Sequence, residues 1–203
     1  MLEEKVIHSI EEQAWIDRAA DPIQKVERDL LHKAPAVADV LHGNWIGHPL
    51  HAAMVSIPVG AWATALVLDG LELAGSGRKY QRAADLATTV GLVGALAAAV
   101  PGAADWSRTQ GGAKRVGFVH AALNLTIAGL YGGSLLARAH GRRKAGIGLS
   151  IGGFSLLMAS AWLGGELAYK YGVGVRPKPE GSATEAERIG ETRSAMPAMG
   201  ARL

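Results

Sequence analysis

The sequence predicts an all-α integral membrane protein, a four-helix bundle preceded by a helical N-terminal extension. Apolar residues make up 49% of the 203 residues and charged residues only 19%. The charges are gathered in the first 47 residues, in the connectors and in the C-terminal tail. Between them lie four nearly charge-free blocks of roughly 20 residues, the length that crosses a bilayer core at about 1.5 Å per residue.

Residues 1–47 form a polar extension in which we expect amphipathic helices. Asp21 and Pro22 predict the end of one helix and the start of the next, because proline suits the first helical turn. Ile23, Val26 and Leu30 then mark one apolar stripe. The alternatives are an extension packed loosely on the bundle and a hairpin that lies on a surface or binds a partner.

The membrane domain covers residues 48–170, with predicted spans at about 49–68, 84–104, 116–136 and 145–167. Pro49 fits the first turn of the first span, and Pro58 predicts a kink within it. Glycine and alanine dominate the spans, and such small residues let membrane helices approach closely. The same stripes could also serve a homo-oligomer.

The composition excludes several kinds of function. The chain has no cysteine, so disulfides, thiolate catalysis and an iron–sulfur cluster of its own are ruled out. A formal charge of +3 is spread over loops and tails without interleaved aromatic residues, so we expect no nucleic-acid partner. The tail, residues 171–203, holds few apolar residues, and we expect disorder from Glu180 to Leu203.

Four spans joined by short connectors must alternate in direction. The end of the bundle that carries both termini, called side A here, therefore gathers one set of polar and aromatic residues: His48, His51, Asp105, Trp106, His120, Asn124, Glu166 and Tyr169. The opposite end, side B, holds Asp69, Glu72, Asp85 and the basic run 142–144. Ionisable groups at membrane depth usually face the bundle interior and mark functional sites.

A weak internal repeat relates the first and third spans. His51-Ala52-Ala53-Met54 resembles His120-Ala121-Ala122-Leu123, and the same alignment matches Gly60 with Gly129, Trp62 with Tyr131 and Leu66 with Leu135. Parallel spans that match in this way indicate two helical hairpins related by an axis along the membrane normal. His51 and His120 would then lie at equal depth across that axis.

The side-A residues allow four interpretations. His51 and His120 could be the axial ligands of a haem b iron. A divalent metal could be bound by His48, His51, His120, Asp105 and Glu166, because imidazole and carboxylate suit zinc, manganese or iron. The histidines could relay protons, since imidazole titrates near neutral pH. The structural alternative is a hydrogen-bonded girdle that fixes helix register.

Several motifs carry a resemblance to a known family: HGNWIGHPLH at 42–51, IPVGAW at 57–62, GAADW at 102–106, GGELAY at 164–169 and GVGV at 172–175. The chain resembles an uncharacterised bacterial membrane family, a domain of unknown function with four transmembrane helices. The resemblance covers roughly residues 38–176. Some relatives carry a Rieske-type iron–sulfur domain after the GVGV segment, which implies a separate redox partner for this cysteine-free chain.

The expected function is that of a multi-pass membrane scaffold or an anchor for a redox partner, without catalysis, because no nucleophile–base–acid constellation and no phosphate-binding motif occurs. The haem or metal carrier and the proton or small-ion pathway are the alternatives. We expect the bacterial inner membrane as the location, with side A and both termini in the cytoplasm.

Overall fold

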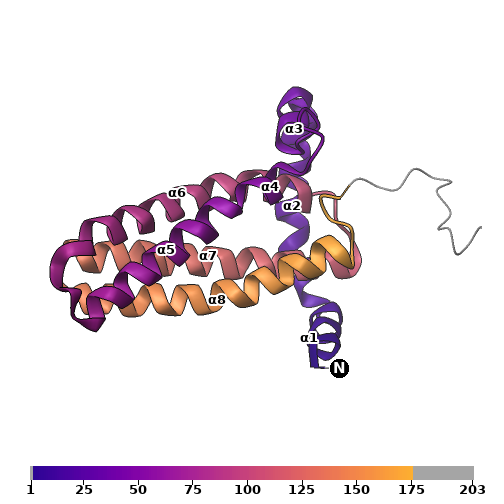
Figure 1. Ribbon diagram of the computed structural model, residues 1–203. Helices are drawn as coiled ribbons and strands as arrows, with labels where there is room; N and C mark the ends of the chain where they lie inside the picture. Colours follow the sequence, from indigo (N-terminus) through magenta and orange to yellow (C-terminus); the bar gives the residue numbers. More distant parts are fainter. Residues whose placement is uncertain (1, 176–203) are drawn as a thin grey trace, which may run out of the picture.

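The computed structural model describes residues 2–175 as an α-helical bundle with a shorter helical bar across one end (Figure 1). The helices of the bundle are α4 (Leu50–Met54), α5 (Ser56–Leu71), α6 (Gln81–Trp106), α7 (Gly111–Ala139) and α8 (Arg143–Tyr169). Four segments are long and apolar enough to cross a membrane: Leu50–Gly75, Arg78–Trp106, Gly111–Ala139 and Arg143–Tyr169. The predicted all-α, four-helix membrane fold is confirmed.

The helix of the first span is interrupted one turn before Pro58, the residue at which the sequence predicts a kink. The break between α4 and α5 falls at Val55, immediately after Met54. Pro58 has no backbone N–H to donate to the carbonyl of Met54, and its ring crowds that same carbonyl. The helical ladder is continued by the hydrogen bond from the N–H of Val59 to the carbonyl of Val55, at 3.3 Å.

The bundle consists of two hairpins. Helix α5 packs along α6, and α7 packs along α8. On side B, α5 passes into a π-helical turn, Glu72–Ser76, and a 3₁₀ turn, Gly77–Tyr80, before α6 begins. Gly75 has φ +103°, a left-handed conformation that favours glycine. Side A holds the short turn between α6 and α7 and the end of α8.

The bar is formed by α1 (Leu2–Glu11), α2 (Trp15–Lys33) and α3 (Pro35–Leu41), and it lies across the side-A end of the bundle (Figure 1). The predicted helix boundary at Asp21 and Pro22 is wrong, because α2 continues through both residues. Contacts with the bundle on both sides of the proline stabilise the longer helix. Asp17 binds Arg115 before it, and Gln24 donates to the carbonyl of Trp106 at 2.8 Å after it.

The ion pair at Asp17 makes the docking of α2 dependent on pH. Hydrogen bonds from Arg115 and then Lys114 lower the pKa of Asp17 from 3.8 to about 2. A carboxylate with a depressed folded-state pKa stabilises the fold above its unfolded value, and this contribution is lost as the pH falls through the folded value. We expect α2 to stay docked at pH 4 and above and to loosen between about pH 4 and pH 2. Hydrogen exchange of the α2 amides checks this. Asp17→Asn should raise exchange already at neutral pH, and equal exchange in both proteins would contradict the prediction.

The core of the bundle is built on an aromatic stack. The rings of Trp62 and Tyr131 lie 3.9 Å apart and nearly parallel, at 4°. Ile127 and Leu157 complete this cluster of buried side chains. A second cluster, formed by Ile7, Val116, Leu163 and Leu167, attaches α1 to α7 and α8. The core therefore runs from the middle of the bundle to the bar.

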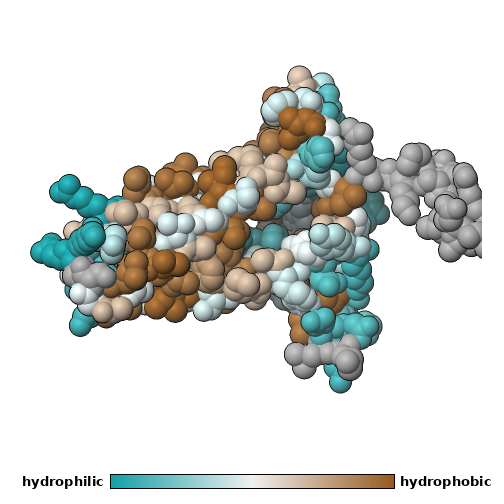
Figure 2. All heavy atoms as spheres, in the orientation of Figure 1, coloured by the Kyte–Doolittle hydropathy of each residue, from teal (hydrophilic) through white to brown (hydrophobic). Residues whose placement is uncertain are grey.

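The outer surface of the bundle is apolar along its length, with hydrophilic residues at both ends (Figure 2). Leu86, Val93, Leu96, Leu125 and Leu136 are among the exposed large side chains. Monomeric soluble proteins rarely expose contiguous apolar surface of this kind. This apolar surface contacts the lipid bilayer.

Candidate functional site

The two histidines predicted to meet across the repeat axis do lie together. The ring centroids of His51 and His120 are 6.4 Å apart, with the rings at 86° to each other. His51 Nδ1 donates to the carbonyl of Ala98 on α6 at 2.8 Å, and His120 Nδ1 donates to the carbonyl of Ser160 on α8 at 2.9 Å. Each ring thus carries a proton on Nδ1, and the lone pair of a neutral ring is on Nε2.

The ring of His120 has more polar neighbours than the ring of His51. Asn124, one turn further along α7, lies with its side-chain nitrogen 3.0 Å from His120 Nε2. The hydroxyl of Ser160 lies 3.1 Å from His120 Nδ1. Glycines make room for both rings, since a Cβ on Gly102 would lie 2.7 Å from His51 and one on Gly164 would lie 3.2 Å from His120.

The contacts follow the predicted repeat along the whole bundle. His51 and His120, Trp62 and Tyr131, and Asp69 and Arg138 are each 69 residues apart, and each pair is in contact. The surroundings repeat as well. Gly91 on α6 lies against Trp62, and Gly153 on α8 lies against Tyr131. The two hairpins place equivalent side chains on a common axis, with the histidine pair near side A.

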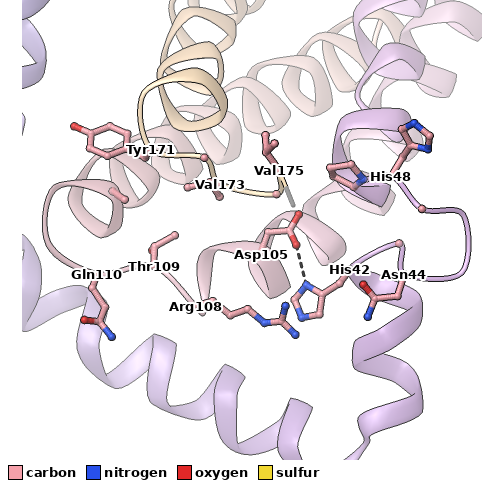
Figure 3. Close-up of a pocket in the computed structure, with 16 residues that line it drawn as sticks. His42, Asn44, His48, Asp105, Arg108, Thr109, Gln110, Tyr171, Val173 and Val175 are labelled. Atoms are coloured by element: carbon pink, nitrogen blue, oxygen red, sulfur yellow. Dashed lines mark hydrogen bonds and ion pairs between the residues drawn. The ribbon is translucent and has the colours of Figure 1, made fainter. Parts of the chain in front are cut away.

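A pocket of about 530 Å³ opens at side A (Figure 3). It is lined by the loop 42–49, by the turn between α6 and α7 and by residues 171–175. His42 Nδ1 donates to Asp105 Oδ1 at 2.8 Å, and both side chains are almost fully buried. His42 Nε2 is buried and has no hydrogen-bond partner among the described residues.

The other predicted site residues are spread around the histidine pair and the pocket. His48 lines the pocket, and its Nδ1 donates to the carbonyl of Ile46 at 3.1 Å. The Trp106 indole donates to the carbonyl of Lys114, while Tyr169 is 93% exposed. Glu166 is half-buried. Within residues 2–175, no three His, Asp or Glu side chains are grouped as a metal-binding set would require.

Side B contains a buried ionic network. Arg138 binds Asp69 with both terminal nitrogens, at 2.8 and 2.5 Å, and contacts Asp85 at 3.0 Å. Arg143 contacts Asp85 at 2.8 Å and Glu72 at 2.5 Å. Such bidentate guanidinium–carboxylate pairs are among the strongest and most directional polar contacts in proteins. The network ties all four spans together at the end opposite the histidines.

Two features were missed by sequence reasoning. His42 stands in the HGNWIGHPLH motif, but its pairing with Asp105 requires the chain to fold back after α3. The burial of Arg138 against Asp69 was not predicted. The repeat offered a signal for Arg138, because the alignment that pairs His51 with His120 also places Asp69 opposite Arg138.

Comparison with known families gives one match. A profile described as "Predicted membrane protein (DUF2231)" matches residues 47–177, more than half of the chain. No curated protein and no solved structure matches. The matched region includes the four spans, the histidine pair and the segment that closes the pocket, whereas His42 lies just before it. The chain belongs to the DUF2231 family of predicted membrane proteins.

Proposed function

We propose that this membrane protein is a b-type haem carrier whose axial ligands are His51 and His120. The observation that carries the proposal is the pair itself: two imidazoles from different hairpins, each held through Nδ1 by a backbone carbonyl. Metal-binding histidines typically donate their other ring N–H to a carbonyl or carboxylate, which fixes the tautomer and the ring orientation.

The separation of the ring centroids is close to the value that one iron between the two imidazoles would require. A ligating nitrogen lies roughly 2 Å from a first-row metal ion, and the ring centroid about 1 Å further, so two opposed imidazoles have centroids roughly 6 Å apart. The observed separation is 6.4 Å. Asn124 contacts His120 Nε2 in this structure, so that nitrogen would exchange this contact for the iron when haem is bound.

The number of ligands favours haem over a bare metal ion. Zinc and similar ions need three or four protein ligands, whereas a porphyrin supplies four nitrogens and leaves two axial positions. The histidine pair supplies two ligands, and no group of three candidate ligands exists within residues 2–175. When bound, haem would supply one-electron redox chemistry.

The chain's own residues would hold and insulate that group. Ala98 and Ser160 orient the two imidazoles through their carbonyls. Gly102 and Gly164 keep the facing helices close to the rings. The stacked Trp62 and Tyr131 close the bundle interior below the pair. Both histidines are half-buried, and the apolar residues around a bound group would tune its redox potential.

A visible spectrum of the purified protein tests the proposal. We expect a Soret band from about one haem per chain, with sharpened visible bands on dithionite reduction, in protein produced with a supplied haem precursor. His51→Ala and His120→Ala should each lose the six-coordinate spectrum. His48→Ala is the matched control, because His48 is at the same end but outside the pair, and it should keep the spectrum.

Two results would overturn the haem proposal. One is a folded, colourless protein that does not take up added haemin. The other is an unchanged spectrum in both pair variants, which would place the ligands elsewhere. Size-exclusion elution at the wild-type volume shows that a variant has remained folded.

An anchor for a redox partner is the second candidate, and the helical bar favours it. Helices α1 to α3 form a platform at side A, next to the end of the spans (Figure 1). A Rieske-type protein is the partner that the family resemblance implies. A colourless protein that nevertheless co-purifies with an iron–sulfur protein would support this candidate over the haem carrier.

A proton or small-ion pathway has less support, because the stacked Trp62 and Tyr131 fill the middle of the bundle. For the location, the proposal keeps the bacterial inner membrane with side A in the cytoplasm. Reporter fusions at both ends of the chain test this orientation, and periplasmic activity at either end would contradict it.

A further inference from the structure

We infer that α2, with α3 continuing it, lies in the lipid–water interface of the same membrane that the bundle spans. The inference begins with apolar side chains that the fold leaves uncovered. Ile23, Val26 and Leu30 are 46%, 59% and 60% exposed. They follow one another at helical spacing and therefore form one continuous stripe on α2.

The faces of α2 show which way this stripe points. Asp17, Asp21, Gln24 and Arg28 contact the turn between α6 and α7 and the first residues of α7. That turn lies at the end of the spans, and we take the border of α2 that contacts it as the one turned away from the bilayer. At 100° per residue, the exposed Arg18, Lys25 and Asp29 follow on the same side.

The apolar stripe lies on the other side of the α2 face that packs on the bundle. Ile16 and Ala20 are fully buried, and Ile23, Val26 and Leu30 come next around the helix, on the border opposite to the charged residues. Helix α2 runs across the bundle rather than along it (Figure 1). We therefore place the stripe at the depth of the lipid headgroups. An amphipathic helix in this position buries its apolar face in the headgroup and acyl boundary.

Helix α3 and the loop after it extend the same surface. Val37 and Val40 are half-exposed, and Figure 2 shows hydrophobic atoms over α3. Trp15 and Trp45, at the two ends of this region, are 57% and 67% exposed. Tryptophan is enriched at membrane interfaces, where its ring fits the headgroup level.

Burial of apolar area, rather than charge, holds the bar to the membrane. Residues 2–47 contain nine acidic and five basic residues, so attraction to anionic lipid is not the driving force. The bar should therefore bind to vesicles of phosphatidylcholine alone. Its binding should not weaken at high salt, because salt screens only electrostatic adsorption.

The absence of cysteine makes a direct test simple. Single variants Val26→Cys and Leu30→Cys are spin-labelled and reconstituted in phosphatidylcholine vesicles. Lys25→Cys and Asp29→Cys, on the polar face of the same helix, are the matched controls. Collision with lipid-soluble oxygen and with a water-soluble nickel chelate then reports the surroundings of each label.

We expect the stripe labels to collide several-fold more with oxygen than with the nickel chelate, and the control labels to show the reverse. Equal access of the chelate to Val26 and Lys25 would place the stripe in water and overturn the inference. Protection of the stripe labels from both reagents would show that protein covers it, which also overturns it. The readout does not depend on haem, so the two proposals fail separately.

Discussion

Replacing Arg138 by methionine is expected to destabilise the bundle by about 3–5 kcal/mol, the usual cost of removing one partner from a buried ion pair. Asp69 is only 1% exposed, and the variant removes its bidentate guanidinium partner. Arg143 remains near Asp69, at 3.4 Å, but it already binds Glu72 and Asp85. Thermal or denaturant unfolding in detergent measures the loss.

A double variant separates the buried charge from the lost packing. Asp69→Leu combined with Arg138→Met removes both charges and should be more stable than Arg138→Met alone. Arg142→Met makes the same chemical change at an exposed position of the neighbouring connector and should leave unfolding unchanged. A wild-type melting curve for Arg138→Met would show that the network does not stabilise the fold.

Replacing Trp62 by alanine is expected to cost a similar amount, about 3–5 kcal/mol, through loss of packing. The Trp62 side chain is 2% exposed, and its ring stacks on Tyr131 at 3.9 Å. Its indole also donates to the carbonyl of Thr88 at 3.3 Å. Leu125→Ala is the control, because that side chain is 75% exposed on the lipid-facing surface. The same unfolding assay compares the two variants.

Gly91 provides an internal check on this explanation. A Cβ at Gly91 would lie 2.3 Å from the Trp62 indole nitrogen, so Gly91→Ala alone should destabilise the bundle. In a Trp62→Ala background the added methyl group meets an empty volume, and the penalty should vanish. Two contacting residues should couple in this way in a double-mutant cycle. Additive losses would contradict the packing explanation.

Much of the fold was predictable because lipid imposes a simple rule on the sequence. Backbone polar groups must be satisfied within each span, so every segment that crosses the membrane forms a helix, and the length of that helix can be predicted from the sequence. The interruption of the first span before Pro58 follows from the chemistry of one residue. The meeting of His51 and His120 followed from span direction and the internal repeat.

The helical bar was less predictable. The stripe of Ile23, Val26 and Leu30 is helical in spacing, but the bundle packs against a different face that includes the polar Gln24. That choice depends on the turn between α6 and α7, where the Gln24 amide donates to the carbonyls of Trp106 and Thr109. No local sequence pattern in α2 indicates these hydrogen-bond partners.

By itself, the sequence determined the four lipid-crossing helices, their alternation and the depth of the paired histidines, since hydropathy and chain direction act locally along the chain. Only the tertiary structure decided that Asp105 pairs with His42 rather than with the central histidines, and that Arg138 is buried. It also left the apolar stripe of α2 uncovered. The reason is physical: a buried polar group takes whichever partner the packed helices bring within hydrogen-bond distance, and that distance is set by the whole bundle.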